Sequence, residues 1–257
     1  SEMCIRDSAT LVEHHRAGHF APFSLADVVE YPVQSSALGR LRMRWRQHPK
    51  RVLDLSKQRF GPEDVFHITD QEQAHLVPPR SARRPKMVVT VHDVFHLFPF
   101  SQRIALTDGK TTVGTSVVNV GDQRPGMIRK RDLKKLKAGL ARADLLVCDS
   151  EHTRLRCSEA FPKVPSICVP LGLDVEAFAP LAGREKNAAF TMLYVGSADP
   201  RKRLSFLERV LRTCSGDVLG QSVLHVVGDR SPEAHAMASS LGMEVVVHPL
   251  LEDEDLM

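Results

Sequence analysis

The chain has 257 residues and a formal net charge of +4, enough length for one large domain or two smaller ones. No apolar run approaches the roughly 20 residues that a membrane-spanning helix needs, and no secretory signal is visible. The five cysteines are scattered without a Cys-x-x-Cys pair, which argues against a disulfide framework and for reduced thiols in a cytoplasmic protein.

The first third of the chain is predicted to form a helical segment followed by two strands. Apolar residues between Leu38 and Leu55 share a helical face, and a kink or split is expected at Pro49. Short apolar runs then predict strands at 64–68 and 86–91.

The middle of the chain is predicted to contain a long loop and then to return to regular structure. The stretch from about Leu97 to Met127 is poorly patterned and holds four glycines, which predicts a functional loop. A helix is expected at 129–141 and a buried strand at 144–148. Ser150 is in position to cap the helix that follows.

The pattern restarts after a charged stretch at 179–187, whose proline and glycine indicate a linker. The apolar run 190–195 predicts a buried strand, and a helix is expected to begin at Asp199-Pro200. Two further strands are predicted, at 223–227 and 245–247.

The turn between strand 190–195 and the next helix has the composition of an anion site. Gly196 breaks the strand, and unpaired backbone N–H groups point outward where the helix begins. Arg201 and Lys202 would place two cations in the first turn, where the helix dipole disfavours positive charge. A strongly anionic ligand such as a diphosphate explains this arrangement, and an ordinary solvated first turn explains it equally well.

The alternation of elements predicts the domain organisation. Nearly continuous apolar strands that alternate with helices are typical of parallel sheets covered on both faces. The linker divides them into two α/β domains, at residues 9–180 and 187–257. Residues 1–8 do not resemble the start of a domain and are set aside.

Six short motifs occur in the order found in one enzyme family. Each is weak by itself, but together they span most of the chain from Val65 onward. They are VFHITDQ (65–71), VVTVHD (88–93), ARADLLVCDSEHTR (141–154), ICVPLGLDVEAFAP (167–180), LYVGSADPRKRL (193–204) and VVGD (226–229). In this order they resemble the family 4 glycosyltransferases of the GT-B architecture, in which two Rossmann-like domains face each other across a cleft.

The resemblance implies an activity. It implies transfer of a sugar from a nucleoside-diphosphate sugar to an acceptor hydroxyl with retention of configuration, as in glycan biosynthesis. No metal and no cofactor beyond the donor sugar nucleotide is implied. The acceptor would be a saccharide, a lipid-linked molecule or a small molecule, and no nucleic acid is expected as a partner.

The resemblance also implies roles for individual residues. His92 lies at a strand end of the first domain, facing the donor sugar, and the catalytic assignment covers His92 and Asp93. The donor diphosphate would be held by Gly196, Ser197, Arg201 and Lys202, with Gly228 and Asp229 also on the donor side. The acceptor side would include Asp70, Gln71, Ser150 and Thr153.

Two departures from the family pattern bear on activity. The glycine-rich loop that normally follows the first strand of the first domain is absent, and so is the paired-glutamate motif of the second. The first domain is therefore expected to lack its opening strand and the second to be truncated. We expect the chain by itself not to transfer sugar.

Other interpretations stay open at this point. The same two-domain pattern would serve a non-catalytic module that binds nucleotide sugars. His92-Asp93 with His96 has a spacing found in metal-dependent phosphohydrolases, although that class is helical. The basic helices at 40–51 and 129–137 are expected to expose their cations to solvent. The alternative is that they contact the acidic inner surface of a membrane.

Overall fold

The computed structural model describes residues 12–14, 16–18, 24–26, 28–29, 35–58, 60–81, 83–107, 112–172, 189–196, 202–228, 236 and 240–248. The chain divides into two compact units, one formed by residues 1–99 and 121–171 and the other by residues 100–120 and 172–257. The predicted linker at 179–187 lies outside the described residues. Within the described part of the chain, no helix is long and apolar enough to cross a membrane.

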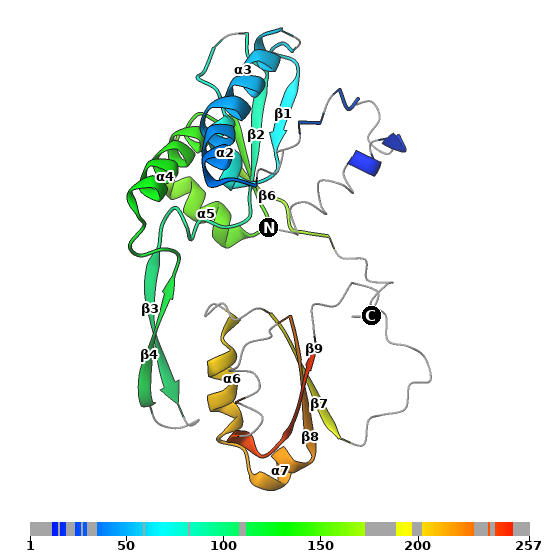
Figure 1. The fold of residues 1–257 in the computed structure, drawn as a ribbon, viewed down its shortest axis with the longest axis vertical. Helices are drawn as coiled ribbons and strands as arrows, with labels where there is room; N and C mark the ends of the chain where they lie inside the picture. Colours follow the sequence, from blue (N-terminus) through cyan, green and yellow to red (C-terminus); the bar gives the residue numbers. More distant parts are fainter. Residues whose placement is uncertain are drawn as a thin grey trace. The chain divides into compact units, whose positions relative to one another are not determined.

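The first unit is built on a four-stranded parallel sheet with the order β1-β2-β5-β6 (Figure 1). Its strands are β1 (Val65–Ile68), β2 (Lys86–Val91), β5 (Leu145–Cys148) and β6 (Ser166–Cys168). In β2 alternate side chains are fully buried, because Met87, Val89 and Val91 all point toward the core. The prediction of apolar parallel strands is confirmed for this unit.

Three helices cover the core face of this sheet. They are η2 (Gln71–Leu76, a 3-10 helix), α4 (Met127–Leu140) and α5 (Glu151–Ala160). Leu136 and Leu140 of α4 and Cys157 of α5 are fully buried against the sheet. Gly139 lets α4 approach η2 closely, since a Cβ atom there would lie 1.8 Å from the Ala74 carbonyl oxygen.

The helical segment before β1 changes its winding in front of Pro49. It consists of α2 (Ala37–Arg42), a π-helical turn η1 (Met43–Gln47) and α3 (His48–Gln58). The backbone N–H of His48 donates to the Met43 carbonyl, five residues back. Proline lacks the N–H that would continue the regular ladder, so the predicted interruption takes the form of a wider turn.

An antiparallel hairpin replaces the long loop predicted between Leu97 and Met127. Strands β3 (Phe100–Thr107) and β4 (Thr112–Val120) pair along their length, with a register shift at Leu106/Thr107. The loop prediction was wrong because glycines and polar residues interrupt the apolar alternation of each strand. Cross-strand backbone pairing supplies the missing order, together with a 2.7 Å hydrogen bond from Ser101 Oγ to Asn119 Oδ1.

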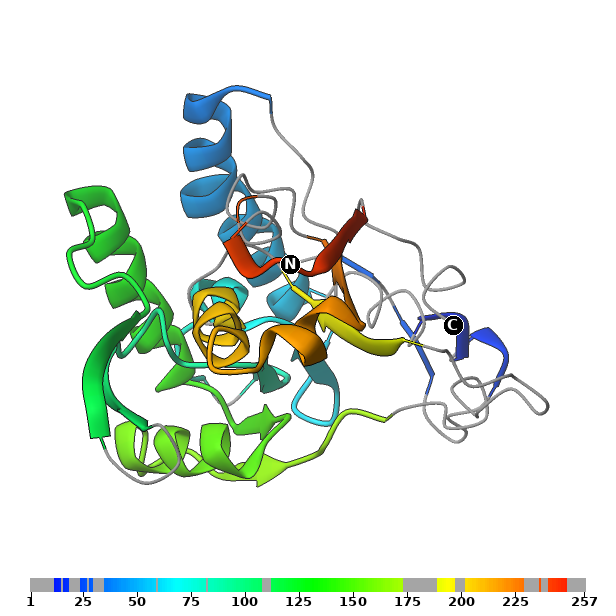
Figure 2. The same ribbon diagram turned by 90° about the horizontal axis from the view of Figure 1, so that it is seen from below.

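The second unit contains a three-stranded parallel sheet with the order β7-β8-β9. Its elements are β7 (Phe190–Val195), α6 (Leu204–Leu211), α7 (Gly216–Gly220), β8 (Ser222–Val227) and β9 (Glu244–His248). Helix α6 lies against one face of this sheet (Figure 2). On that face Leu211 packs with Leu224 and Val226.

The described helices cover only one face of each sheet. On the other face, Val65 and Ile167 are exposed in the first unit, and Leu193 and Val195 are exposed in the second. The expectation that helices cover both faces is therefore wrong for the described part of the chain. A continuous apolar strand predicts burial, but it does not say which segment provides the cover.

Candidate functional site

Polar side chains gather at the carboxyl edge of the first sheet. Because the strands are parallel, the residues that follow β1, β2 and β5 all meet at this edge. Thr69 to Gln71 follow β1, His92 follows β2, and Asp149 follows β5.

His92 is the centre of this cluster and is held by three neighbours. Its backbone N–H donates to Gln71 Oε1 at 3.0 Å. Its ring Nε2 lies 3.1 Å from the Thr69 carbonyl oxygen, and its Nδ1 lies 3.3 Å from Asp149 Oδ2. Both ring nitrogens thus face oxygen atoms of the protein. The side chain remains partly accessible, at 20% relative exposure.

The start of α5 contributes a relay of hydroxyl groups to His92. Ser150 caps the helix by accepting from the Thr153 backbone N–H at 3.2 Å, as predicted. Ser150 Oγ also donates to Thr153 Oγ1 (2.9 Å), which in turn donates to the His92 carbonyl oxygen (3.3 Å). Gln71, Ser150 and Thr153 therefore come together around His92.

The two aspartates predicted for this edge close turns. Asp93 Oδ1 accepts from the Phe95 backbone N–H at 3.2 Å, just after β2. Asp70 caps η2 by accepting from the Glu72 backbone N–H at 2.8 Å. These contacts fix the backbone on either side of His92.

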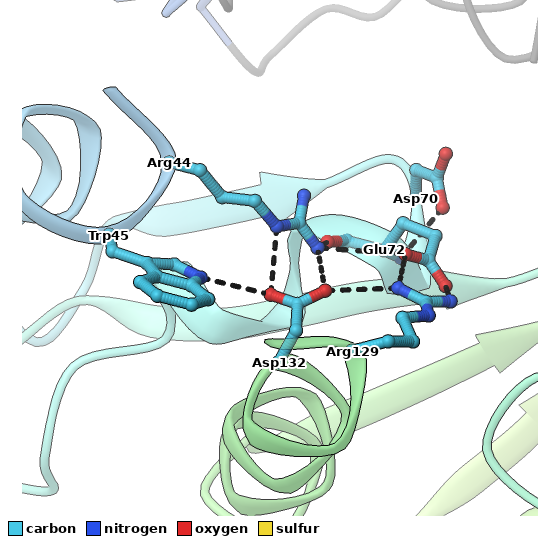
Figure 3. A network of polar contacts seen from close by, with 6 residues as sticks. All are labelled: Arg44, Trp45, Asp70, Glu72, Arg129 and Asp132. Carbon is cyan, nitrogen blue, oxygen red and sulfur yellow. Dashed lines mark hydrogen bonds and ion pairs between the residues drawn. The ribbon is translucent and has the colours of Figure 1, made fainter. Parts of the chain in front are cut away.

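A network of ion pairs links η2 to η1 and α4 (Figure 3). Asp132 on α4 is 5% exposed and receives two hydrogen bonds from Arg44, at 2.8 and 2.9 Å. Arg129 donates to Asp132 at 2.9 Å and to both carboxylate oxygens of Glu72 at 2.8 Å. Trp45 Nε1 adds a fourth hydrogen bond to Asp132, at 3.2 Å. The network joins η1, η2 and α4, and two cations balance two anions.

The electrostatics of the network follow from this balance. Burial opposes ionisation of Glu72, but the hydrogen bond and charge of Arg129 outweigh it and lower the Glu72 pKa. Burial likewise opposes ionisation of Asp132, and the contacts with Arg44 outweigh it, so the Asp132 pKa is also lowered. Nearby, burial and the charge of Arg44 lower the pKa of His75 to about 4.

The network corrects one expectation about the basic helices. Arg44 and Arg129 lie within the segments expected to be solvated faces, yet both are committed to partly buried ion pairs. The contacts of Arg44 with Glu72 and Asp132, and of Arg129 with Glu72, span 28 to 88 residues of sequence, so no local pattern predicts them. Only the Arg129–Asp132 pair, at a spacing of three residues, is local. Asp149 was also missed, although its place directly after a strand, like that of His92, was a usable signal.

The second sheet has glycines at the same kind of edge. Gly196 follows β7 and donates its N–H to the Val227 carbonyl at 3.0 Å, and Gly228 follows β8 with φ of +83°. Lys202 is exposed, and its side chain lies close to Gly196, where a Cβ atom would approach Lys202 Cγ at 3.2 Å. The predicted residues Ser197, Arg201 and Asp229 lie outside the described residues.

The helix after β7 begins later than predicted. Helix α6 starts at Leu204, with Arg203 at its N-cap in the left-handed conformation (φ of +60°). Lys202 therefore precedes the helix and is not in its first turn. The Asp-Pro pair at 199–200 carried a start signal, but the amphipathic stripe that packs on the sheet begins with Leu204.

Comparison with known proteins gives a fold-level likeness. No protein-family model matches the sequence, and no curated protein matches it. Among solved structures, that of OtsA in its apo form is similar, with a TM-score of 0.52 and 15% sequence identity. The chain has a GT-B-like fold. The match covers 87% of this chain but only 55% of the OtsA chain, so the GT-B-like chain spans about half the length of that neighbour.

Proposed function

We propose that the protein is a retaining glycosyltransferase that moves a sugar from a nucleoside-diphosphate sugar to an acceptor hydroxyl, with no other cofactor. The observation that carries the proposal is the His92 cluster at the carboxyl edge of a parallel sheet in a GT-B-like fold. Ligands of open parallel sheets bind at that edge. The likeness to OtsA supports the fold, and the six motifs support the activity.

In this proposal the two carboxyl edges have separate tasks. The leaving diphosphate gains negative charge as the sugar bond breaks, and Gly196, Ser197, Arg201 and Lys202 stabilise it. Gly196 suits this task because the absence of a Cβ lets the side chain of Lys202 lie against the strand end, where the diphosphate would bind. Gly228 and Asp229 complete the donor side.

His92 would meet the donor sugar from the other edge. Asp149 and the Thr69 carbonyl hold its ring, and Gln71 and Thr153 hold its backbone. Gln71, Ser150 and Thr153, assigned to the acceptor side, act here as positioning residues for His92. Asp70 and Asp93 shape the adjoining turns through their backbone contacts.

A non-catalytic module that binds nucleotide sugars is the second candidate. The observation that favours it is that both ring nitrogens of His92 face groups of the protein itself. A catalytic His92 must exchange at least one of these contacts for the donor. Both are at the long end of the hydrogen-bond range, which makes such an exchange inexpensive.

Calorimetry on the full chain tests the donor site. Replacing Arg201 and Lys202 together with alanine should weaken binding of a nucleoside diphosphate by ~2–4 kcal/mol, because two charge-assisted contacts are lost. The double variant Lys163→Ala/Arg209→Ala removes two other exposed cations and should change the affinity by less than ~0.5 kcal/mol. Equal effects of both variants would contradict the assignment.

Release of nucleoside diphosphate from a sugar nucleotide, with and without acceptor, separates the two candidates when it is measured on a protein in which both domains are complete. Acceptor-dependent release that His92→Ala abolishes, with nucleotide affinity retained, supports the transferase. Donor binding without release in the presence of a range of acceptors supports the module.

A further inference from the structure

A pocket of about 520 Å³ opens between η1 and the start of α4, on the far side of the ion-pair network. Leu41 and Trp45 line it from η1 and its approach, and Gly126, Met127 and Ile128 line it from α4. Arg44, Arg129 and Asp132 form its polar floor. Because Glu72 and Asp132 together neutralise Arg44 and Arg129, these side chains offer no unpaired charge to a ligand.

Large apolar side chains are exposed at this pocket and one helical turn before it: Met127 and Ile128 line the pocket, and Leu38 lies three residues before the lining residue Leu41. Met127 is 88% exposed, Leu38 is 78% exposed and Ile128 is 58% exposed. Leu38, Leu41 and Trp45 share one face of the helical segment, at spacings of three and seven residues. A cluster of this kind on a charged protein surface marks an interaction site.

The surroundings of this apolar cluster carry charge of one sign. Arg42 and Arg46 are exposed beside it on the first helical segment, and Lys130 and Lys134 are exposed on α4. Residues 35 to 53 contain no acidic residue. The single acidic residue of α4, Asp132, is paired with Arg44 and Arg129. Within the described residues these four cations form no ion pair.

One side of α4 carries both an exposed apolar side chain and exposed cations. Lys130 and Arg131 lie three and four residues after Met127, and Lys134 lies four residues after Lys130, so all four positions share one side of the helix. The face thus presents a thioether tip followed by a row of cations. Apolar side chains flanked by cations are the groups by which a protein surface binds an anionic membrane, since the former enter the acyl boundary and the latter contact the phosphates.

The geometry of Trp45 argues against nucleic acid as the partner. Arg131 lies 5.3 Å and Lys135 4.7 Å from its ring centroid, so both cations stack on the aromatic group that could receive a base. The exposed groups are aliphatic and so suit lipid chains. We propose that Leu38, Met127 and Ile128, flanked by Arg42, Arg46, Lys130 and Lys134, form a docking surface for an anionic lipid bilayer. The inference stands independently of the proposed transferase activity.

Vesicle co-sedimentation with the full chain tests the proposal. The chain should sediment with phosphatidylcholine vesicles that contain phosphatidylglycerol and not with phosphatidylcholine alone, and salt at ~0.5 M should release it. Lys130→Gln/Lys134→Gln should weaken binding about ten- to thirtyfold, because each cation near an anionic surface contributes about a factor of five. Met127→Ser/Ile128→Ser should weaken it about tenfold or more.

Matched variants in the same unit act as controls. Lys86→Gln/Lys163→Gln removes two exposed cations, and Leu155→Ser/Val169→Ser removes two exposed apolar side chains, away from the pocket. Both should change binding less than about twofold, and thermal unfolding checks that every variant is folded.

Three results would overturn the proposal. One is no binding to anionic vesicles, and another is equal binding to neutral vesicles. The third is a loss that the control variants reproduce. Binding of a single-stranded RNA oligonucleotide that matches vesicle binding in strength and ignores Met127→Ser/Ile128→Ser would assign the surface to nucleic acid instead.

Discussion

The carboxyl edge of the first sheet consists of side chains in mutual contact, whereas the described edge of the second sheet consists mainly of glycine backbone. At the first edge, His92 is fixed through four hydrogen bonds to neighbouring elements. At the second, Gly196 and Gly228 end two strands, and Lys202 lies alongside. The first edge thus presents fixed side chains, whereas the second presents the backbone of two glycines with Lys202 beside it. Under the proposed function, the first edge would meet the sugar and the second the diphosphate.

The first edge is also held in place by partly buried ion pairs. Arg44, Glu72, Arg129 and Asp132 hold η2, whose first residue is Gln71, one of the partners of His92. The described part of the second unit has no comparable buried ion pair, since its Arg212–Glu208 pair is partly exposed. We therefore expect the first edge to depend on distant residues and the second on local backbone.

The largest effect should come from removing the centre of the network. Asp132→Ala leaves Arg44 and Arg129 partly buried without their shared partner and should lower the free energy of unfolding by ~3–5 kcal/mol. Denaturant unfolding measures it. The control Asp54→Ala breaks the exposed Lys50–Asp54 pair and should cost less than ~1 kcal/mol. A loss from Asp132→Ala as small as that from Asp54→Ala would show that the network does not brace the first edge.

A smaller effect is expected from His75, which is buried behind the same edge. Its two ring nitrogens have no hydrogen-bond partner among the described residues, and burial lowers its pKa to about 4. The unfolded chain therefore takes up a proton first. Stability should fall by ~2–3 kcal/mol as the pH drops from about 6.5 to about 4, with no further loss from His75 below that.

The variant His75→Leu separates this contribution from others. Burial also lowers the pKa values of His48 and His67, which add to the fall in the same window. The lowered pKa values of Glu72 and Asp132 make their contribution disappear only as the pH falls below about 4. Chemical unfolding at several pH values should show a shallower fall for His75→Leu above pH ~4. An unchanged slope would mean that His75 is solvated.

The smallest effect concerns the backbone of the second edge. Gly228 has φ of +83°, so Gly228→Ala should cost about 1 kcal/mol through left-handed strain. Gly216→Ala is the matched control, because nothing lies within 4 Å of its added Cβ and alanine favours the helix α7. Thermal unfolding should move in opposite directions for the two variants. A destabilisation of equal size at both would remove the argument for a special backbone at the second edge.

Much of the fold and part of the candidate site could be predicted from local sequence. Strands β2, β5, β7 and β8 follow apolar runs, and the N-cap at Ser150 follows from residue type alone. The parallel arrangement then places His92 beside the residues after β1 and β5. Asp149 was within reach of the same reasoning, because the carboxyl ends of parallel strands share an edge.

Other features of the fold depended on contacts between residues far apart in the sequence, which a short stretch of sequence cannot reveal. The β3–β4 hairpin lacks an apolar alternation strong enough to predict it, and its order comes from pairing between strands. The start of α6 moved from the Asp-Pro signal to Leu204 because packing on the sheet begins there.

The sequence by itself determined the elements whose hydrophobic period was long and regular, and through them the parallel sheets and the position of His92 at an edge. Only the tertiary structure decided the partners of charged residues. Arg44 and Lys50 are both basic residues of one helical segment, yet the first is held by a buried carboxylate and the second by an exposed one. The physical reason is that burial follows from local periodicity, whereas the neutralisation of a charge depends on which distant carboxylate the fold brings within hydrogen-bond distance.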